Sequence, residues 1–452
     1  MKDRPYTVHR LLFLTFVSVA IHAANPLPQV LSCGKEGSVG GLGAGTDLTR
    51  HAIDLTRFPE AVCNDGTGAI FYYGASTKPE DRNKWILFLQ GGGSCVDGQT
   101  CAQRWCSVDT NYGFDKMSTS IAKPQIRGVG FLNPASANKF GSWNRVLIYY
   151  CSSDSWSGTA VRTLQAVAND GSTREYQIHF KGARILDAVI DTLRNAPASS
   201  RRRAARHDIG TDADASWPDL DEATAVILAG SSAGGVGTKA NMDRVGAKLH
   251  ATNPDLDYRA VVDASYLTLA ENRNFTISTY CAKDPVNGCS YEAFTKATEE
   301  AIDGGLYGAR TEESCLQWHT ANAPGTEWRC GDGEHVFMHH ATTPFFLRQD
   351  LLDPQVGGVF VDANFGTPAD FAMAVESELR NLQTPEEPHE TPGLFVPQCA
   401  DHESFTTNEP VFDVMINGVT WHDAVWNWFT HAQPQQLIRH FTGTASRAPE
   451  CP

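Results

Sequence analysis

The stretch Ala225–Gly237, with the sequence AVILAGSSAGGVG, decides the fold. Its first five residues form a continuous apolar run, which is typical of a strand buried on both faces. The run leads directly into Gly230-Ser231-Ser232-Ala233-Gly234, which has the pattern G-x-S-x-G, and residues Thr238 to Leu249 can form a helix after it. A strand, a sharp turn and a helix in this order expose the middle serine on a strained turn. The stretch therefore predicts that Ser232 is a nucleophile.

The turn could instead cap a helix or cradle a phosphate. The strand before it, with Gly235 and Gly237 after it, favours the nucleophile. Glycines two residues before and two after the serine avoid collisions with the neighbouring strand and helix. The free N–H groups of the helix N-terminus favour the negative charge that develops in acyl transfer.

Further apolar runs at Trp85–Leu89 and Val146–Tyr150 resemble this strand. Between the second run and Ala225, apolar residues recur at three- and four-residue spacing, which predicts a helix over 182–195. Later strands are expected at Arg259–Asp263 and Phe345–Leu347. Alternating strands and helices predict an α/β fold with a mostly parallel sheet and helices on both faces.

A glycine triplet follows the first of these runs, in Gln90-Gly91-Gly92-Gly93-Ser94. Because it lies at a strand end, as does Ser232, both loops are expected at the carboxyl edge of the sheet. Backbone N–H groups at such a place can form an oxyanion hole. We assign Gly92 and Ala233 as donors, with Gly91 or Gly93 as a substitute for Gly92; a flexible turn is the other interpretation.

Composition excludes several classes of protein. The 452 residues carry 37 Lys and Arg against 52 Asp and Glu, a net charge of −15, so a nucleic-acid partner is not expected. Residues 1–23 combine a basic start, an apolar run of eleven and a small-residue end, which predicts a secretory signal peptide. No later stretch is long enough to span a membrane. Removal of the signal takes away three basic and one acidic side chain, which leaves −17.

The remaining residues, 24–452, are expected to form one catalytic domain with an exposed polar insertion around 197–221. All twelve cysteines lie in this part and are expected to form disulfides in the oxidising compartment that a secreted protein enters. Asn274-Phe275-Thr276 is a potential glycosylation site. The sequence does not indicate the oligomeric state.

The base is expected to be a histidine that follows Ser232 in the chain. His402 lies three residues after Cys399, and a disulfide there could hold its loop in place. The residues alone do not favour it over the other candidates, which are His389, His422 and His431.

A second group of histidines, His335, His339 and His340, does not match the spacing H-E-x-x-H. No cysteine or carboxylate at metal-ligand spacing completes a site. We therefore expect an exposed helix turn there, and neither a metal nor another cofactor.

Four blocks resemble the pectin acetylesterases and the related Notum carboxylesterases of the α/β-hydrolase superfamily. They are LQGGGSC at 89–95, YYCSSDSWSG at 149–158, LAGSSAGGVGTKANMDRV at 228–245, and the late pair 344–355 and 397–402. The likeness is closer to the Notum branch than to the plant pectin enzymes. It implies an α/β-hydrolase fold and a secreted serine esterase that needs no cofactor.

Carried over position by position, the resemblance places the nucleophile at Ser232, the base at His402 and the acid at Asp353. The family's acid lies nine residues after a proline that opens a strand, here Pro344, which selects Asp353 over Asp350. Two departures are the pair Gly93-Ser94, where the Notum loop has bulky aromatic residues, and Pro354 after the acid.

The resemblance implies an acylated polysaccharide or an acylated secreted protein as substrate. The small Gly93-Ser94 pair argues against a simple transfer of the lipid-pocket geometry, so we expect removal of O-acetyl groups from a polysaccharide, although the charge of −17 would repel an anionic polymer. The alternative is a palmitoleoyl-protein carboxylesterase. A second alternative is an inactive carbohydrate-binding protein with Trp421, Trp426 and Trp428 as a stacking face, which the complete set of triad positions disfavours.

Overall fold

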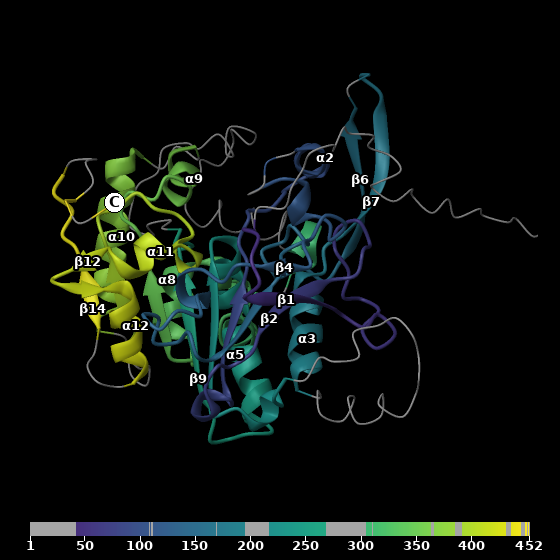
Figure 1. The fold of residues 1–452 in the computed structure, drawn as a ribbon. Coiled ribbons are helices and arrows are strands. Elements are labelled where there is room, and N and C mark those ends of the chain that lie inside the picture. Colours follow the sequence, from purple (N-terminus) through teal and green to yellow (C-terminus); the bar gives the residue numbers. More distant parts are fainter. Residues whose placement is uncertain are drawn as a thin grey trace, which may run out of the picture.

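A ten-stranded sheet forms the centre of the computed structural model (Figure 1). The structure describes residues 42–107, 109, 112–168, 170–194, 217–267, 304–309, 311–362, 366–384, 391–430, 435–443, 448–449 and 451. The expected signal peptide, Asn274 and residues 197–216 of the expected insertion lie outside this part of the chain.

The sheet is mostly parallel. Strands β5, β3, β8, β9, β10, β11 and β14 run parallel, and β2, β1 and β4 add an antiparallel edge next to β5. In sheet order the strands are β14 (Gln436–Ile438), β11 (Gly393–Val396), β10 (Phe345–Arg348), β9 (Asp257–Asp263), β8 (Ala225–Ser231), β3 (Lys84–Leu89), β5 (Asn144–Ile148), β2 (Ile70–Gly74), β1 (Leu48–Ala52) and β4 (Gln125–Ile126).

The expected strands are confirmed with small shifts at their ends. The largest shift concerns Val146–Tyr150, because β5 ends at Ile148. The hydroxyl groups of both tyrosines that follow donate hydrogen bonds outside the sheet, Tyr149 to the Asp115 carbonyl at 2.6 Å and Tyr150 to the Gly93 carbonyl at 2.8 Å. These aromatic residues therefore pack the loops at the sheet edge.

Helices cover both faces of the sheet. Tyr258 donates to the Met242 carbonyl in α5 (Ala233–His250), and the next residue of β9, Arg259, donates to the Trp428 carbonyl in α12 (Trp421–Phe429). Successive strand residues point to opposite faces, so α5 and α12 lie on opposite sides. The remaining helices are α2 (Gly98–Cys106), α3 (Gly182–Leu193), α7 (Glu313–Asn322), α8 (Gly333–His339), α9 (Val356–Asp362), α10 (Pro368–Asn381) and α11 (Asn408–Phe412).

The tryptophans of α12 belong to the core. Trp421 has none of its surface exposed and Trp428 has 8%. Trp426 packs edge-on against Phe140, with ring centroids 5.0 Å apart. The alternative of a carbohydrate-stacking face at these residues is therefore wrong.

A two-stranded hairpin, β6 (Val161–Val167) and β7 (Thr173–His179), stands out from the body beside α2 (Figure 1). The Tyr176 hydroxyl donates to the Gly98 carbonyl at 2.5 Å and so attaches the hairpin to this helix. A second, shorter hairpin consists of β12 (Met415–Ile416) and β13 (Val419–Thr420). Among the described residues, no helix combines the length and apolar character needed to cross a bilayer.

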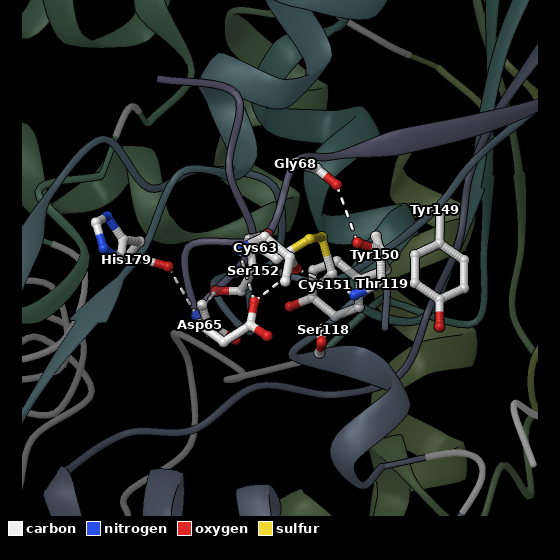
Figure 2. The surroundings of a disulfide bond; sticks show 12 residues. Cys63, Asp65, Gly68, Ser118, Thr119, Tyr149, Tyr150, Cys151, Ser152 and His179 are labelled. Atoms are coloured by element: carbon white, nitrogen blue, oxygen red, sulfur yellow. Dashed lines mark hydrogen bonds between the residues drawn. A yellow bond between two sulfur atoms is a disulfide. The ribbon is translucent and has the colours of Figure 1, made fainter. Parts of the chain in front are cut away.

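Between residues that the structure describes, four disulfides hold the loops around the sheet: Cys63–Cys151, Cys95–Cys101, Cys315–Cys330 and Cys399–Cys451. Figure 2 shows the first of these, which joins the segment before β2 to the loop after β5. Beside it the Thr119 hydroxyl donates to the Gly68 carbonyl at 3.0 Å. The fourth disulfide lies next to His402 in the chain, as the sequence suggested.

Helix α5 begins at Ala233, five residues before the start expected at Thr238. Its first turns contain Gly234, Gly235 and Gly237, which are weak helix formers and therefore conceal the true start in the sequence. Packing requires these glycines. A Cβ atom on Gly234 would collide with the Leu89 carbonyl at the end of β3, and one on Gly230 would collide with the Gly234 carbonyl.

We predict that Gly234→Ala destabilises the protein by roughly 1–3 kcal/mol, because the added methyl group meets rigid backbone. The measurement is the free energy of unfolding in denaturant. Gly358→Ala in α9 is the matched control, since a Cβ there has no neighbour within 4 Å. It should be neutral or stabilise by up to about 1 kcal/mol. Equal effects of the two substitutions would contradict the packing role of Gly234.

Candidate active site

Four loops meet at the carboxyl edge of the sheet. They follow strands β3, β8, β10 and β11. Strand β3 pairs with β8 in parallel, and β10 pairs with β11 in parallel. Leu89 at the end of β3 is paired with Gly230 of β8, so the glycine triplet and Ser232 start from the same level. Asp353 follows β10, and His402 follows β11. The topology thus brings together residues that are far apart in the sequence.

Ser232 occupies a strained turn. Its backbone angles are φ 56° and ψ −124°, a region that residues with a side chain rarely adopt. The Ser232 N–H donates to the Asp263 carbonyl at 2.9 Å, which ties the turn to the end of β9. Ser232 is also the N-cap residue of α5, so its side chain lies at the positive end of the helix dipole.

His402 and Asp353 form a close pair. His402 Nδ1 lies 2.9 Å from Asp353 Oδ2 and 3.0 Å from Oδ1. The carboxylate has further donors: the side-chain amide of Gln349 at 3.0 Å and the N–H groups of Gln355 and Val356 at 2.9 and 3.0 Å. These bonds fix the carboxylate, and the carboxylate in turn fixes the imidazole ring with Nδ1 as the protonated nitrogen.

The pKa of the His402 imidazole is raised above its ordinary value. Burial works against this, but the hydrogen bond and negative charge of Asp353, with the charges of Glu403 and Asp263, outweigh it. The other ring nitrogen, Nε2, is buried and has no hydrogen-bond partner in the part of the chain that the structure describes. A basic ring with a free lone pair can accept a proton from a hydroxyl group.

Asp350 has a different task from Asp353. Its carboxylate pairs with Arg348 at 2.7 Å and accepts a hydrogen bond from the Asp401 N–H at 3.0 Å. Burial raises the pKa of Asp350 to about 7 despite the charge of Arg348. Asp350 therefore anchors the residue before His402 and does not orient the imidazole.

A buried network continues from Arg348 to the turn that carries Ser232. Arg348 pairs with Asp263 at 3.2 Å. The other oxygen of Asp263 accepts from the Ser231 hydroxyl at 2.6 Å and from the Phe405 N–H at 2.9 Å. One carboxylate thus connects the serine turn, β10 and the histidine loop. The sequence analysis missed it because an acid at a strand end is more often exposed.

The glycine triplet is held through its carbonyl groups. Trp156 Nε1 donates to the Gln90 carbonyl at 3.0 Å, and Arg104 donates to the Gly92 carbonyl at 2.6 Å. Gly92 and Gly93 have φ values of 135° and 62°, which favour glycine. Each bond fixes one peptide plane of the loop, as a preformed oxyanion hole requires.

Residues 149–158 support the glycine loop through hydrogen bonds from Tyr150 and Trp156. The Asp154 carboxylate is completely buried and accepts from the Ser152 hydroxyl at 2.7 Å and from the Trp156 and Gly182 N–H groups at 3.1 and 2.8 Å. Burial raises the pKa of Asp154 to about 6 despite these bonds. The carboxylate therefore fixes the position of Trp156, and Trp156 in turn fixes the glycine loop through its bond to the Gln90 carbonyl.

Glu403 is a further charged residue at the site that the sequence analysis did not select. It has a left-handed backbone, with φ 58°. Its Oε1 atom is buried, has no hydrogen-bond partner among the described residues, and lies so close to Gly91 that a Cβ there would collide with it. Burial raises the pKa of this carboxyl, and the neighbouring charge of His402 opposes the rise.

A cavity of about 620 Å³ opens beside these residues. Its polar wall includes Gln90, Gly91, Lys116, Arg127, His402 and Glu403. Its apolar wall consists of Leu42, Phe88, Val129, Leu132 and Leu147. The volume lies within the range of roughly 300–1,000 Å³ that is common for small-molecule sites.

Of the other histidine candidates, His422 lies in the described part of the chain and is not part of this arrangement. His422 Nε2 accepts a hydrogen bond from the Lys139 N–H at 3.0 Å, and its ring packs against Phe412. His389 and His431 lie outside the described residues. Of the residues proposed from the sequence, the structure pairs His402 with Asp353, whereas His402 and Ser232 form no hydrogen bond with each other in the described part of the chain.

The arrangement of strands and helices is that of the α/β-hydrolases, and comparisons with known proteins refine this class. A model of the pectinacetylesterase family matches residues 44–201, which include the glycine triplet and the 149–158 block. The chain is 29% identical to palmitoleoyl-protein carboxylesterase notum2 of Xenopus laevis, over 87% of this chain and 70% of that protein. It is 26% identical to palmitoleoyl-protein carboxylesterase NOTUM of Homo sapiens, over 84% of this chain and 66% of that protein.

Among solved structures, the Wnt deacylase Notum from Drosophila is similar with a TM-score of 0.63, at 23% sequence identity. The match covers 90% of this chain and 100% of that chain, and it shows the shared fold. The curated Drosophila melanogaster protein is much longer, and this chain spans 50% of its length. The family model and the Notum relatives together support the pectin acetylesterase and Notum family of carboxylesterases for this chain.

We predict that Glu403→Gln shifts the acid limb of the pH profile of kcat/KM to lower pH. With His402 as the base that the sequence predicts, this limb reports the loss of the proton from its protonated ring, and the negative charge of Glu403 helps to raise the pKa of that ring. Removal of this charge lowers the pKa, so a larger fraction of His402 is the neutral base in mildly acidic solution.

The matched control for this prediction is Glu409→Gln, an exposed glutamate in α11 that should leave the profile unchanged. The measurement is hydrolysis of a small aryl ester across the pH range. An acid limb that stays in place or moves to higher pH in Glu403→Gln would contradict the coupling.

Proposed function

We propose that the protein is a secreted serine esterase that removes a fatty acyl group from another secreted protein. In this proposal Ser232 is the nucleophile, His402 the base and Asp353 the residue that orients the base. The single observation that carries it is the pairing of His402 with Asp353 at 2.9 Å at the edge where Ser232 lies, with the opposite ring nitrogen buried and without a hydrogen-bond partner among the described residues.

The proposed reaction has two stages. His402 takes the proton of the Ser232 hydroxyl as the oxygen attacks the ester carbonyl, and the proton then goes to the departing alcohol. Water hydrolyses the acyl-enzyme, again with His402 as the base. Asp353 keeps the proton on Nδ1 and stabilises the imidazolium, without itself becoming protonated.

The proposed oxyanion hole consists of the Gly92 and Ala233 N–H groups. The Ala233 N–H belongs to the first turn of α5, where backbone donors lack helical partners. Arg104 holds the Gly92 carbonyl, which fixes the peptide plane next to that of the Gly92 N–H, and the backbone at Gly93 is left-handed. Fixed donors stabilise the developing charge without reorganisation, and loss of one donor typically costs about 10²–10³ in kcat.

Two observations favour an acylated protein over the acetylated polysaccharide expected from the sequence. The relatives reported above are named palmitoleoyl-protein carboxylesterases or Wnt deacylase. The cavity beside His402 has an apolar wall that includes Phe88, Leu132 and Leu147, which suits an acyl chain. The predicted signal peptide and the disulfides support a location outside the cell.

We predict that Ser232→Ala abolishes hydrolysis of a small aryl ester and labelling by a fluorophosphonate, while the fold stays intact. The reason is that no acyl-enzyme can form without the hydroxyl group. Ser231→Ala tests the neighbouring hydroxyl, which is committed to Asp263, and should still be labelled. Retained turnover in Ser232→Ala would place the nucleophile elsewhere.

We predict that kcat/KM on aryl esters rises from acetate to decanoate. Each methylene group that becomes buried contributes about 0.8 kcal/mol, or roughly fourfold per group. Ser232→Ala measures the background hydrolysis of each ester. A preference for acetate, with activity falling as the chain lengthens, would instead support the acetylated polysaccharide as the substrate.

A further inference from the structure

Three histidines outside the active site converge on one point. His319 lies on α7, His335 on α8, and His340 directly follows α8. The Nε2 atoms of His319 and His335 are 2.9 Å apart, and those of His335 and His340 are 3.2 Å apart. His319 and His340 are 3% and 7% exposed, so the expectation of an exposed helix turn with no further role does not describe this cluster.

The hydrogen bonds define the state of His319. The Thr326 hydroxyl donates to the Ala323 carbonyl at 2.6 Å, so its single proton is used there. The contact of 2.7 Å between Thr326 Oγ1 and His319 Nδ1 must then be donated by the imidazole. In the neutral ring Nε2 therefore carries a lone pair, and this lone pair faces the other two histidines.

Ordinary hydrogen bonds satisfy this arrangement poorly. His319 Nε2 can only accept, so a single proton on His335 Nε2 would have to be shared between the contacts of 2.9 and 3.2 Å. The converging nitrogen atoms of the three rings form a set of ligands suited to a cation.

We propose that His319, His335 and His340 bind a divalent transition-metal ion of the zinc type through their Nε2 atoms. Nitrogen atoms bound at 2.0–2.1 Å to a tetrahedral zinc ion lie about 3.3 Å from one another, so small side-chain movements would complete the geometry. Neutral imidazole suits Zn²⁺ and Co²⁺, whereas Mg²⁺ and Ca²⁺ require oxygen ligands. The bond from His319 Nδ1 to Thr326 is the outer support that metal-bound histidines usually have.

The surroundings suggest that the ion has a structural role. Cys315 lies near the three nitrogens, but its sulfur is bonded to Cys330 and cannot act as a thiolate ligand. The two cysteines and Val336 form a small apolar cluster of their own. Such a small core contributes little stability, and a metal ion that joins α7 to α8 would supplement the disulfide.

The test is a titration of Zn²⁺ into chelator-treated, oxidised, full-length protein that carries no polyhistidine tag. We expect one Zn²⁺ per chain and a rise in the melting temperature with Zn²⁺, because a ligand that binds the folded state stabilises it. His335→Asn should lose the saturable binding and the stabilisation, while its hydrolysis of aryl esters stays unchanged. Co²⁺ should give the visible absorption of a tetrahedral site in the wild-type protein only.

Two further variants distinguish a preformed Zn²⁺ site from nonspecific Zn²⁺ binding by exposed histidines. His440→Gln removes a histidine whose side chain is 84% exposed and should bind Zn²⁺ as the wild type does. Thr326→Val keeps the three ligands but removes the support of His319, and should weaken Zn²⁺ binding by about 10–100-fold. Absence of stoichiometric binding, or equal binding by wild type and by folded His335→Asn or Thr326→Val, would overturn the proposal.

Discussion

The Asp263 carboxylate is the constraint on which the site depends. It is completely buried, and a buried charge is tolerated only when its hydrogen bonds and an opposite charge compensate the loss of water. Its partners come from three separate segments: the Ser231 hydroxyl at the end of β8, the Arg348 guanidinium at the end of β10 and the Phe405 N–H in the loop after β11. Removal of one partner from such a buried pair typically costs about 3–5 kcal/mol, so each segment is held in one position relative to the others.

The network also explains how a strained serine turn can persist. A residue in a rarely populated backbone conformation costs about 1–3 kcal/mol and needs support from its surroundings. The Ser232 N–H is supported by its hydrogen bond to the Asp263 carbonyl. The loop of His402 is supported by the hydrogen bond from the Asp401 N–H to the Asp350 carboxylate. The chain of buried charges from Asp263 through Arg348 to Asp350 therefore runs beneath both ends of the proposed catalytic pair. In such a preorganised site the free energy needed to orient the polar groups is spent during folding, so these groups need little reorientation during the reaction.

The sequence could predict those parts of the site that depend on local backbone chemistry. Apolar runs marked the central strands, and the glycines around Ser232 marked the turn, because few other residues fit there. It could not reveal Asp263 or Glu403, since an acidic residue at a strand end or beside a histidine has no periodic signal that distinguishes buried from exposed positions. His319 was missed for a related reason. It lies 16 residues before His335, and only the fold of α7 against α8 brings the two rings together.

The disulfide between Cys399 and Cys451 ties the loop of His402 to a segment 52 residues further along the chain. The Gln398 carbonyl, just before the bridge, also accepts a hydrogen bond from the Ala448 N–H at 3.1 Å, so the segment before Cys451 lies against this loop. Recombinant production in a reducing cytosol would leave the bridge open, and a shortened version that ends before position 451 could never close it. Both would give material with an intact sheet but a loosened histidine, and a loss of activity in such preparations would reflect how the protein was made and not its chemistry.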